Sequence, residues 1–215
     1  MQTVVVLSGG MDSAVLLARY VKGGDSVCTI SFNYGSKHNE REHQSAVALC
    51  EYYRVGNEYI RLPFIDNLFV SDLLKSGGDV PHGHYEDESM KRTVVPFRNT
   101  IMLSIAAGYA ESVGAGTVAF GPHAGDHAIY PDCRPVFVGA MREVFRLGGY
   151  SHLHLEAPFL GMTKRQIALE GQKLAVPFDL TYSCYEGGDV HCGRCGTCVE
   201  RKEALSGFDA TEYLT

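Results

Sequence analysis

The chain has 215 residues, of which 45% are hydrophobic and 20% are charged, with 24 glycines and no tryptophan. This composition excludes a disordered chain, and the formal net charge of -6 argues against an extended nucleic-acid interface, which needs a basic surface. We therefore expect one sizeable domain with appendages and a small-molecule substrate. The N-terminal residues show no basic leader and no long apolar stretch, so we also expect a cytoplasmic protein without membrane contact.

Strands and helices alternate along the first 175 residues or so. Residues 3–7 form an apolar, β-branched run, which is typical of a parallel strand covered by helices on both faces. From Ala14 to Val21 the apolar residues recur at helical spacing, and the helix is expected to end near Gly23. Later strands are predicted at residues 26–32, 58–62, 117–120 and 152–156, and later helices around residues 46–53, 103–110, 135–147 and 163–174.

This alternation predicts an α/β fold with a doubly wound parallel sheet of about five strands. Residues 1–180 are expected to form the main domain, and residues 181–215 a C-terminal segment packed on it. Residues 63–91 are rich in glycine, histidine and acidic side chains and lack periodicity, which predicts a lid-like insertion. Thr163 is a predicted N-cap of the last core helix, in a capping box with Gln166.

A glycine-rich loop, Ser8-Gly9-Gly10-Met11-Asp12-Ser13, follows the first strand and precedes the first helix. Such a loop presents free backbone N–H groups at a helix N-terminus, where a phosphate binds well. It matches neither the GxGxxG pattern nor the Walker loop. The alternative is a tight turn in which Asp12 or Ser13 caps the following helix and no ligand binds.

Four of the seven cysteines, Cys184, Cys192, Cys195 and Cys198, have the spacing of a tetrahedral metal site. Zinc is the first expectation, and an iron–sulfur cluster is left open by spacing alone. Four sulfur ligands leave no open coordination position, so a zinc ion here is structural. For the nearby Arg201, a solvated basic helix face is the simplest interpretation.

The loop SGGMDS resembles the SGGxDS loop of the N-type ATP pyrophosphatases, the PP-loop family. The resemblance implies an adenine nucleotide alpha hydrolase-like fold in which ATP is the cosubstrate and the loop holds the departing pyrophosphate. Asp12 is then expected to help hold magnesium. The residues that this resemblance assigns to ATP are Leu7, Ser8, Gly9, Gly10, Met11, Asp12, Ser13 and Phe32.

Three further segments, VPFRN at 95–99, YPDCRP at 130–135 and SCYEGG at 183–188 leading into CGRC, resemble the 7-cyano-7-deazaguanine synthase family. The resemblance covers nearly the whole chain and implies a ligase that forms C–N bonds. It would convert 7-carboxy-7-deazaguanine and ammonia to 7-cyano-7-deazaguanine through an adenylated carboxylate and an adenylated amide. The product would feed the queuosine, archaeosine or DNA-modification pathway.

The same resemblance suggests site residues. Arg98 is expected to clamp a phosphate or carboxylate, Asp132 to pair with the guanidine-like edge of the deazapurine, and Arg134 to meet the substrate carboxylate, with Asp126 also in the pocket. Catalytic roles are predicted for Asp12, Arg98 and Asp132. The chain departs from the family pattern at two positions: Phe97 replaces a small residue, and Gly125 stands where an acidic residue is common.

The chain has no spare length for a glutaminase domain, so ammonia is expected from solution or from a partner protein. The resemblance also implies a homodimer and no direct contact with nucleic acid. Two alternatives stay open. One is a tRNA sulfur-transfer enzyme of the same fold, which would need a reactive cysteine or an iron–sulfur cluster; the other is a non-enzymatic zinc-ribbon binding module.

Overall fold

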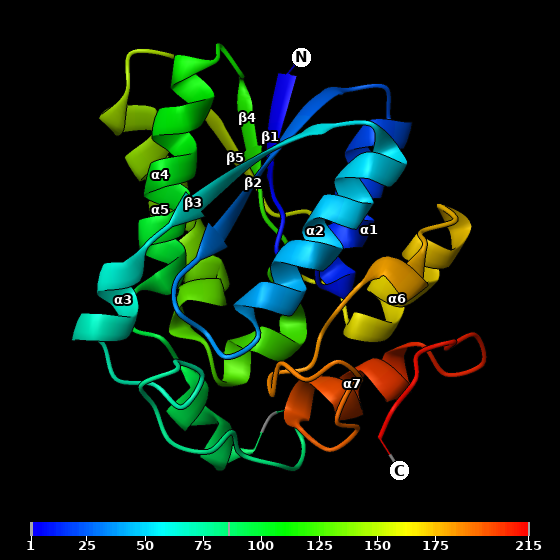
Figure 1. Cartoon of the computed structure of the whole chain (residues 1–215). Coiled ribbons are helices and arrows are strands. Elements are labelled where there is room, and N and C mark those ends of the chain that lie inside the picture. The colour runs from blue at the N-terminus through cyan, green and yellow to red at the C-terminus, as the bar shows by residue number, and fades with distance from the viewer. Residues whose placement is uncertain (1, 86, 215) are drawn as a thin grey trace.

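A computed structural model of the chain describes residues 2–85 and 87–214. Its centre is a sheet of five parallel strands in the order β3-β2-β1-β4-β5 (Figure 1). The bounds of the strands are Gln2–Val6 for β1, Ser26–Asn33 for β2, Gly56–Arg61 for β3, Thr117–Ala119 for β4 and His154–Glu156 for β5. The predicted α/β fold with about five parallel strands is therefore confirmed, although β5 is shorter than the predicted run of residues 152–156.

The described helices are α1 Met11–Lys22, α2 Asn39–Tyr53, α3 Pro63–Leu68, α4 Arg98–Ser112, α5 Pro135–Gly148, α6 Lys164–Lys173 and α7 Gly196–Ala204. Periodicity predicted five of them but neither α3 nor α7, which are too short to show a helical repeat. α2 begins well before the predicted apolar stretch, because its first two turns are polar.

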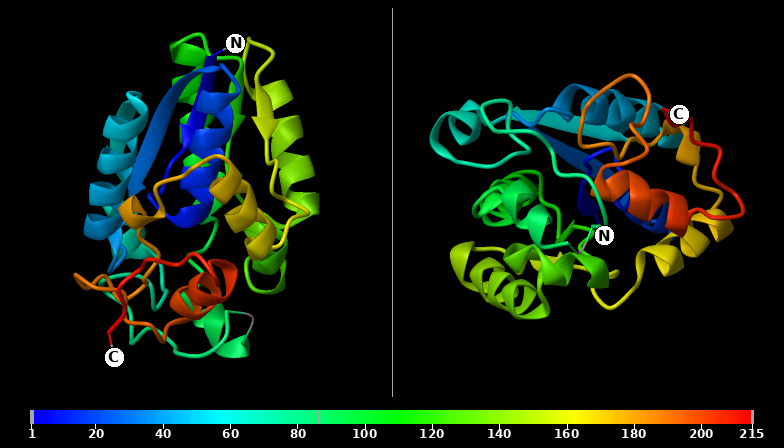
Figure 2. Two further views of the ribbon diagram at one scale, coloured as in Figure 1. Left: turned by 90° about the vertical axis from the view of Figure 1, so that its right-hand side faces the viewer. Right: turned by 90° about the horizontal axis from the view of Figure 1, so that it is seen from below.

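The two faces of the sheet bury alternate residues of each strand, as the pleat requires. Val4 points into one apolar cluster together with residues of α4 and α5, and Val5 points into a second cluster together with residues of α1, α2 and α6. Both valines are fully buried. The sheet is therefore covered on both faces, as the continuous apolar run of β1 predicts (Figures 1 and 2).

The insertion and the C-terminal segment both gather at the carboxyl end of the sheet (Figure 2). They touch each other, since the Gly83 N–H donates to the Arg194 carbonyl (3.3 Å). The C-terminal segment also touches the glycine loop, where the Tyr182 N–H donates to the Gly9 carbonyl (3.0 Å). This end of the sheet is thus enclosed by segments that lie far apart in the sequence.

The N-termini of α6 and α4 lie at this end of the sheet. The predicted capping box of α6 is confirmed: the Gln166 N–H donates to Thr163 Oγ1 (3.2 Å), and the Thr163 N–H donates to Gln166 Oε1 (2.8 Å). At the start of α4, Phe97 has φ of +53° and a side chain 73% exposed. A bulky side chain in the left-handed region is strained, which explains why a small residue suits this position better.

None of the helices described in residues 2–85 and 87–214 is both long and apolar enough to cross a membrane.

Candidate functional site

A cavity of about 230 Å³ lies at the carboxyl ends of β1, β2 and β4. The neighbours of β1 in the sheet are β2 on one side and β4 on the other, so β1 marks the switch point where doubly wound sheets bind ligands. The lining residues come from segments spread over the whole chain. Those that carry the argument below are Ser8, Asp12, Phe32, Glu42, Arg98, Asp126, Lys164 and Tyr185.

The glycine loop forms one wall of the cavity. Gly9 has φ of +88°, and a Cβ there would come within 2.3 Å of the Glu42 carbonyl oxygen, so glycine is required by both conformation and space. Gly10 is the N-cap of α1, and no side chain caps this helix. The first N–H groups of α1 therefore remain available to an anion, helped by the hydroxyls of Ser8 and Ser13, which lie 3.1 Å apart.

The other residues assigned to ATP surround this wall. Leu7, Met11 and Phe32 line the same cavity, with Phe32 at the end of β2. Gly9 does not line it, because this residue faces α2. The structure thus brings most of the predicted set to one place, and their contact with ATP stays a prediction.

Beside the loop lies a cluster of buried charges that the sequence analysis missed in part. The Lys164 ammonium is 2.7 Å from Asp12 Oδ2 and 3.1 Å from Glu200 Oε2. Burial alone would raise the pKa of Asp12, but Lys164 outweighs it and the pKa is lowered; the same pairing keeps the pKa of Lys164 above its usual value despite burial. Both groups are therefore charged at neutral pH.

A sequence signal for Lys164 exists. It follows the N-cap Thr163 in the first turn of α6, where a cation opposes the helix dipole and needs nearby anions. For Glu200 there is no comparable signal, because the helix α7 that carries it was not predicted.

Asp126 also lines the cavity, as predicted, but both of its oxygens have protein partners. Oδ2 accepts from the His123 N–H (2.9 Å), and Oδ1 accepts from the Tyr85 hydroxyl (3.0 Å). The neighbouring Gly125 has little room, since a Cβ there would lie 3.0 Å from His123 Cε1 and 3.1 Å from Glu200 Oε1. A larger residue at position 125 would press on this cluster, so the departure from the family pattern suits its surroundings.

Arg98 enters the cavity from the first turn of α4 and lies among aromatic rings. Its guanidinium is 5.6 Å from the Tyr34 ring centre and 6.0 Å from that of Tyr130, and it donates to the Tyr34 hydroxyl (3.3 Å). The Tyr130 and Tyr185 hydroxyls are 3.2 Å apart. Tyr130 and Tyr185 lie in the sequence motifs, but no role was predicted for either of them. Together with Arg98 and Tyr34 they form a cationic, aromatic wall that suits a flat, anionic ring compound.

Asp132 and Arg134 are absent from the cavity lining within the described residues. The Asp132 carboxylate accepts from the Asn99 N–H (2.9 Å), so it holds the start of α4 next to Arg98. The exposed Arg134 donates through Nε to the His127 carbonyl (2.9 Å). Their contact with a substrate stays a prediction, and the observed partner of the Asp132 carboxylate is the start of α4.

Two further side chains in the cavity have shifted pKa values: Glu42 in the first turn of α2, and His38 at the N-cap of that helix. Burial raises the pKa of Glu42 to about 8, and burial together with the Arg98 charge lowers the pKa of His38 to about 4. The only hydrogen bond to the Glu42 carboxyl in the described structure is a long one from Asn39 Nδ2 (3.4 Å). His38 is therefore neutral at physiological pH, whereas Glu42 titrates near it.

Cys133 is the cysteine that lines the cavity outside the C-terminal cluster. Burial, together with the charges of Asp126 and Asp132, raises its pKa well above the usual value. It is therefore a thiol and not a reactive thiolate at neutral pH.

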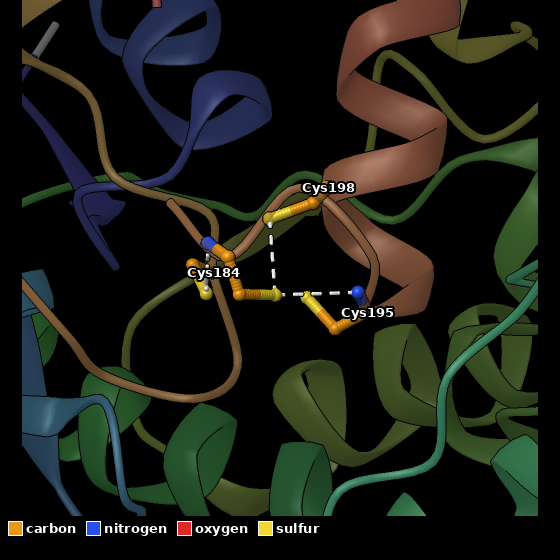
Figure 3. A group of neighbouring side chains, drawn as sticks. Cys184, Cys195 and Cys198 are labelled. Carbon is orange, nitrogen blue, oxygen red and sulfur yellow. Dashed lines mark hydrogen bonds between the residues drawn. The ribbon is translucent and has the colours of Figure 1, made fainter. Parts of the chain in front are cut away.

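The four clustered cysteines come together in the structure, and Figure 3 labels three of them, Cys184, Cys195 and Cys198. All four are buried, and their sulfur atoms lie within 4.8 Å of one another. Backbone N–H groups of Cys192 and Cys195 donate to Cys184 Sγ and Cys192 Sγ (both 3.3 Å), as expected where thiolates need stabilisation. This donor set fits a tetrahedral ion such as zinc. It is the one group of this kind among the described residues.

Arg201 corrects an expectation. It is not on a solvated face but is 1% exposed, and it donates to the hydroxyls of Thr211, Thr181 and Ser183 and to the Phe178 carbonyl. A buried guanidinium with these partners fastens the segment before Cys184 to α7 and to the C-terminal residues.

The chain is similar to known proteins over nearly all of its length. The family model described as "Queuosine biosynthesis protein QueC" matches residues 2–209. A 7-cyano-7-deazaguanine synthase from Desulfotalea psychrophila is 55% identical over 215 residues, which cover 99% of this chain and 98% of that protein. A protein of the same name from Porphyromonas gingivalis strain W83 is 51% identical over 216 residues, with 98% and 96% covered.

A solved complex of a 4-thiouridine synthetase with RNA and bound ATP aligns with a TM-score of 0.53 at 18% identity. The alignment covers 83% of this chain and 42% of that chain, and it shows a shared fold.

The cysteine cluster predicts one tightly held zinc ion per chain. Cys195→Ala should lose the ion and much of the free energy of unfolding, because structural zinc binding is coupled to folding. Cys28→Ala, outside the cluster, should keep the ion. Elemental analysis of the purified proteins measures both. Iron and a brown colour in the unmodified protein would contradict the assignment to zinc.

The raised pKa of Glu42 predicts a pH dependence of stability. An unfolded glutamate ionises near pH 4.3, whereas folded Glu42 keeps its proton to about pH 8. The folded state therefore holds the extra proton in this window, and the contribution of Glu42 to stability is lost as the pH rises from about 4 to 8. Relative to Glu42→Gln, the unmodified protein should lose more than about 1 kcal/mol of unfolding free energy between pH 5 and pH 8.

Urea unfolding at both pH values measures this difference. Glu51→Gln, at an exposed position of the same helix, is the matched control and should show no such change. A difference for Glu42→Gln that stays constant with pH would show that Glu42 ionises normally.

Proposed function

Because this chain belongs to the queuosine biosynthesis protein QueC family, we propose that it is an ATP-dependent ligase that makes 7-cyano-7-deazaguanine from 7-carboxy-7-deazaguanine and ammonia. The proposal is supported by the match over residues 2–209 and by relatives of that name at 55% and 51% identity. It is also supported by the cavity, which joins a phosphate-binding type of loop to a cationic, aromatic wall. That junction is the single observation that carries it.

The reaction uses two equivalents of ATP. A carboxylate oxygen of the substrate attacks the α-phosphorus, and the bond from phosphorus to pyrophosphate breaks. Ammonia attacks the activated carbon, and AMP leaves with that oxygen and a proton is released, so that the amide forms. A second ATP activates the amide oxygen in the same way, and loss of AMP and of both nitrogen-bound protons leaves the nitrile.

The phosphate half of the site is proposed to consist of the loop, Asp12 and Lys164. The free N–H groups at the start of α1 bind phosphate oxygens, and the Lys164 ammonium adds positive charge. Asp12 Oδ1 is buried without a hydrogen-bond partner, so an oxygen ligand for a cation is available there. Magnesium, when bound, offsets the negative charge of the leaving pyrophosphate.

The substrate half of the site is proposed to be the wall around Arg98. The guanidinium binds the substrate carboxylate, and the tyrosine rings contact the flat deazapurine. Asp132 keeps Arg98 in place through the start of α4, while Asp126 orders Tyr85 and His123. The enclosed cavity protects the reactive adenylates from water.

The remaining parts of the proposal rest on the family resemblance. Residues 1–180 form the catalytic domain, the insertion at 63–91 covers the site, and residues 181–215 are held by a structural zinc ion. Ammonia reaches the site from solution or from a partner protein, and the chain acts as a homodimer without contact to nucleic acid.

Sulfur transfer to tRNA is less well supported. The cavity cysteine Cys133 is a protonated thiol, and four of the other six cysteines lie together in one buried cluster. The likeness to the 4-thiouridine synthetase is one of fold alone.

The test is incubation of the purified protein with ATP, magnesium, ammonium and 7-carboxy-7-deazaguanine, followed by mass spectrometry. Nitrile and AMP should form, with the amide as a transient. Asp12→Asn should slow AMP formation by roughly 100-fold, because it removes a charge that the departing pyrophosphate needs balanced through magnesium.

Asp79→Asn is the matched control, since Asp79 lies at the surface and does not line the cavity. Absence of both amide and nitrile from the unmodified protein, with no release of AMP, would refute the proposed function.

A further inference from the structure

We propose that Glu200 is a positioning residue for ATP. Glu200 holds Lys164 toward the phosphate chain, and the C-terminal segment, residues 181–215, is thereby part of the phosphate site. The inference rests on the proposed function only in its use of ATP and not in the identity of the second substrate. It assigns to the C-terminal segment a task beyond holding a structural ion.

The contacts lead directly from the cysteine cluster to the glycine loop. α7 begins at Gly196, directly after Cys195, and Glu200 follows Cys198 by two residues on that helix. The Glu200 carboxylate is 3.1 Å from the Lys164 ammonium, which in turn is 2.7 Å from the Asp12 carboxylate. One buried lysine thus joins α7 to the first turn of α1.

Two further contacts fix α7 against the same elements. Arg165, the residue after Lys164, donates to the carbonyls of Ala204 (2.7 Å) and Ser206 (2.8 Å) at the C-terminal end of α7. Met11 of the glycine loop is 1% exposed and packs in a small cluster with Ala204 and Leu205. These contacts hold the C-terminal end of α7, and with it Glu200, against α6 and the glycine loop.

The proposed function of Glu200 follows from the position of Lys164 between two carboxylates, those of Asp12 and Glu200. Without nucleotide, two carboxylates balance one ammonium in a buried place, where an unpaired charge would be costly. If Asp12 turns to magnesium when ATP binds, Glu200 is the carboxylate that still restrains Lys164. A lysine side chain held in this way loses less conformational entropy when it contacts a phosphate than an unrestrained lysine side chain does. The small Gly125 leaves the space that Glu200 needs, as its missing Cβ would lie 3.1 Å from Oε1.

The test is the binding of magnesium pyrophosphate to the full, zinc-loaded chain, measured by isothermal titration calorimetry. Glu200→Gln should raise the dissociation constant roughly 10-fold, the size typical for loss of a residue that orients a ligand-binding group. Zinc content should not change, and the protein should stay folded because Lys164 keeps its contact with Asp12. Glu203→Gln, at an exposed position of the same helix, is the matched control and should bind like the unmodified protein.

A double-mutant cycle separates positioning from a general structural role. Lys164→Ala should itself weaken binding, and adding Glu200→Gln to it should have no further effect, because Glu200 acts through Lys164. Three results would overturn the inference: normal binding by Glu200→Gln, additive effects of the two substitutions, or loss of zinc from Glu200→Gln. Because the probe is pyrophosphate, these results are independent of whether the protein forms a nitrile.

Discussion

Pairing of charges in a water-poor cluster is the constraint on which the catalytic end of this molecule depends. Asp12, Lys164 and Glu200 come from α1, α6 and α7, and each side chain is at most about one-fifth exposed. A buried ammonium without its carboxylates would be strongly destabilising, so these three helices must meet for the fold to be stable. The same arrangement places positive charge beside a helix N-terminus that lacks a side-chain cap, which is what a departing pyrophosphate requires. The stability of this end of the fold and the chemistry proposed for it thus depend on one set of contacts.

Local sequence patterns predicted the parts of the structure that local physics determines. The apolar run of β1 predicted a buried parallel strand, Thr163 and Gln166 predicted the capping box, and the cysteine spacing predicted a cluster that fits one ion. Lys164 and Glu200 were missed because their roles come from contacts across more than 150 and almost 40 residues of chain, to which periodicity is blind. The family motifs contained Tyr130 and Tyr185 but did not indicate which of their residues reach the cavity. Asp132 and Arg134 show the same limit, since both lie in a family motif and outside the cavity lining.

The two halves of the site differ in how they are built. The proposed phosphate half consists of backbone groups and short side chains of the glycine loop, together with Lys164 from α6. The close approach of α2 to Gly9 fixes the geometry of the loop. Long and aromatic side chains form the other half of the site. Asp132 and Asp126 hold this half in place by accepting hydrogen bonds from the Asn99 N–H and the Tyr85 hydroxyl. The fold is shared with a 4-thiouridine synthetase, and because a fold does not determine function, the substrate depends on the particular side chains of the site.

The central claim is that one cavity activates the same carbon twice by transferring its oxygens to AMP. The most direct test supplies 7-carboxy-7-deazaguanine with both carboxylate oxygens replaced by oxygen-18, together with ATP, magnesium and ammonium. Mass spectrometry then measures the label in AMP, pyrophosphate and water. The account predicts that each AMP carries one labelled oxygen and that two such AMP molecules form for each nitrile. Label in pyrophosphate or water, or a nitrile formed with unlabelled AMP, would contradict it.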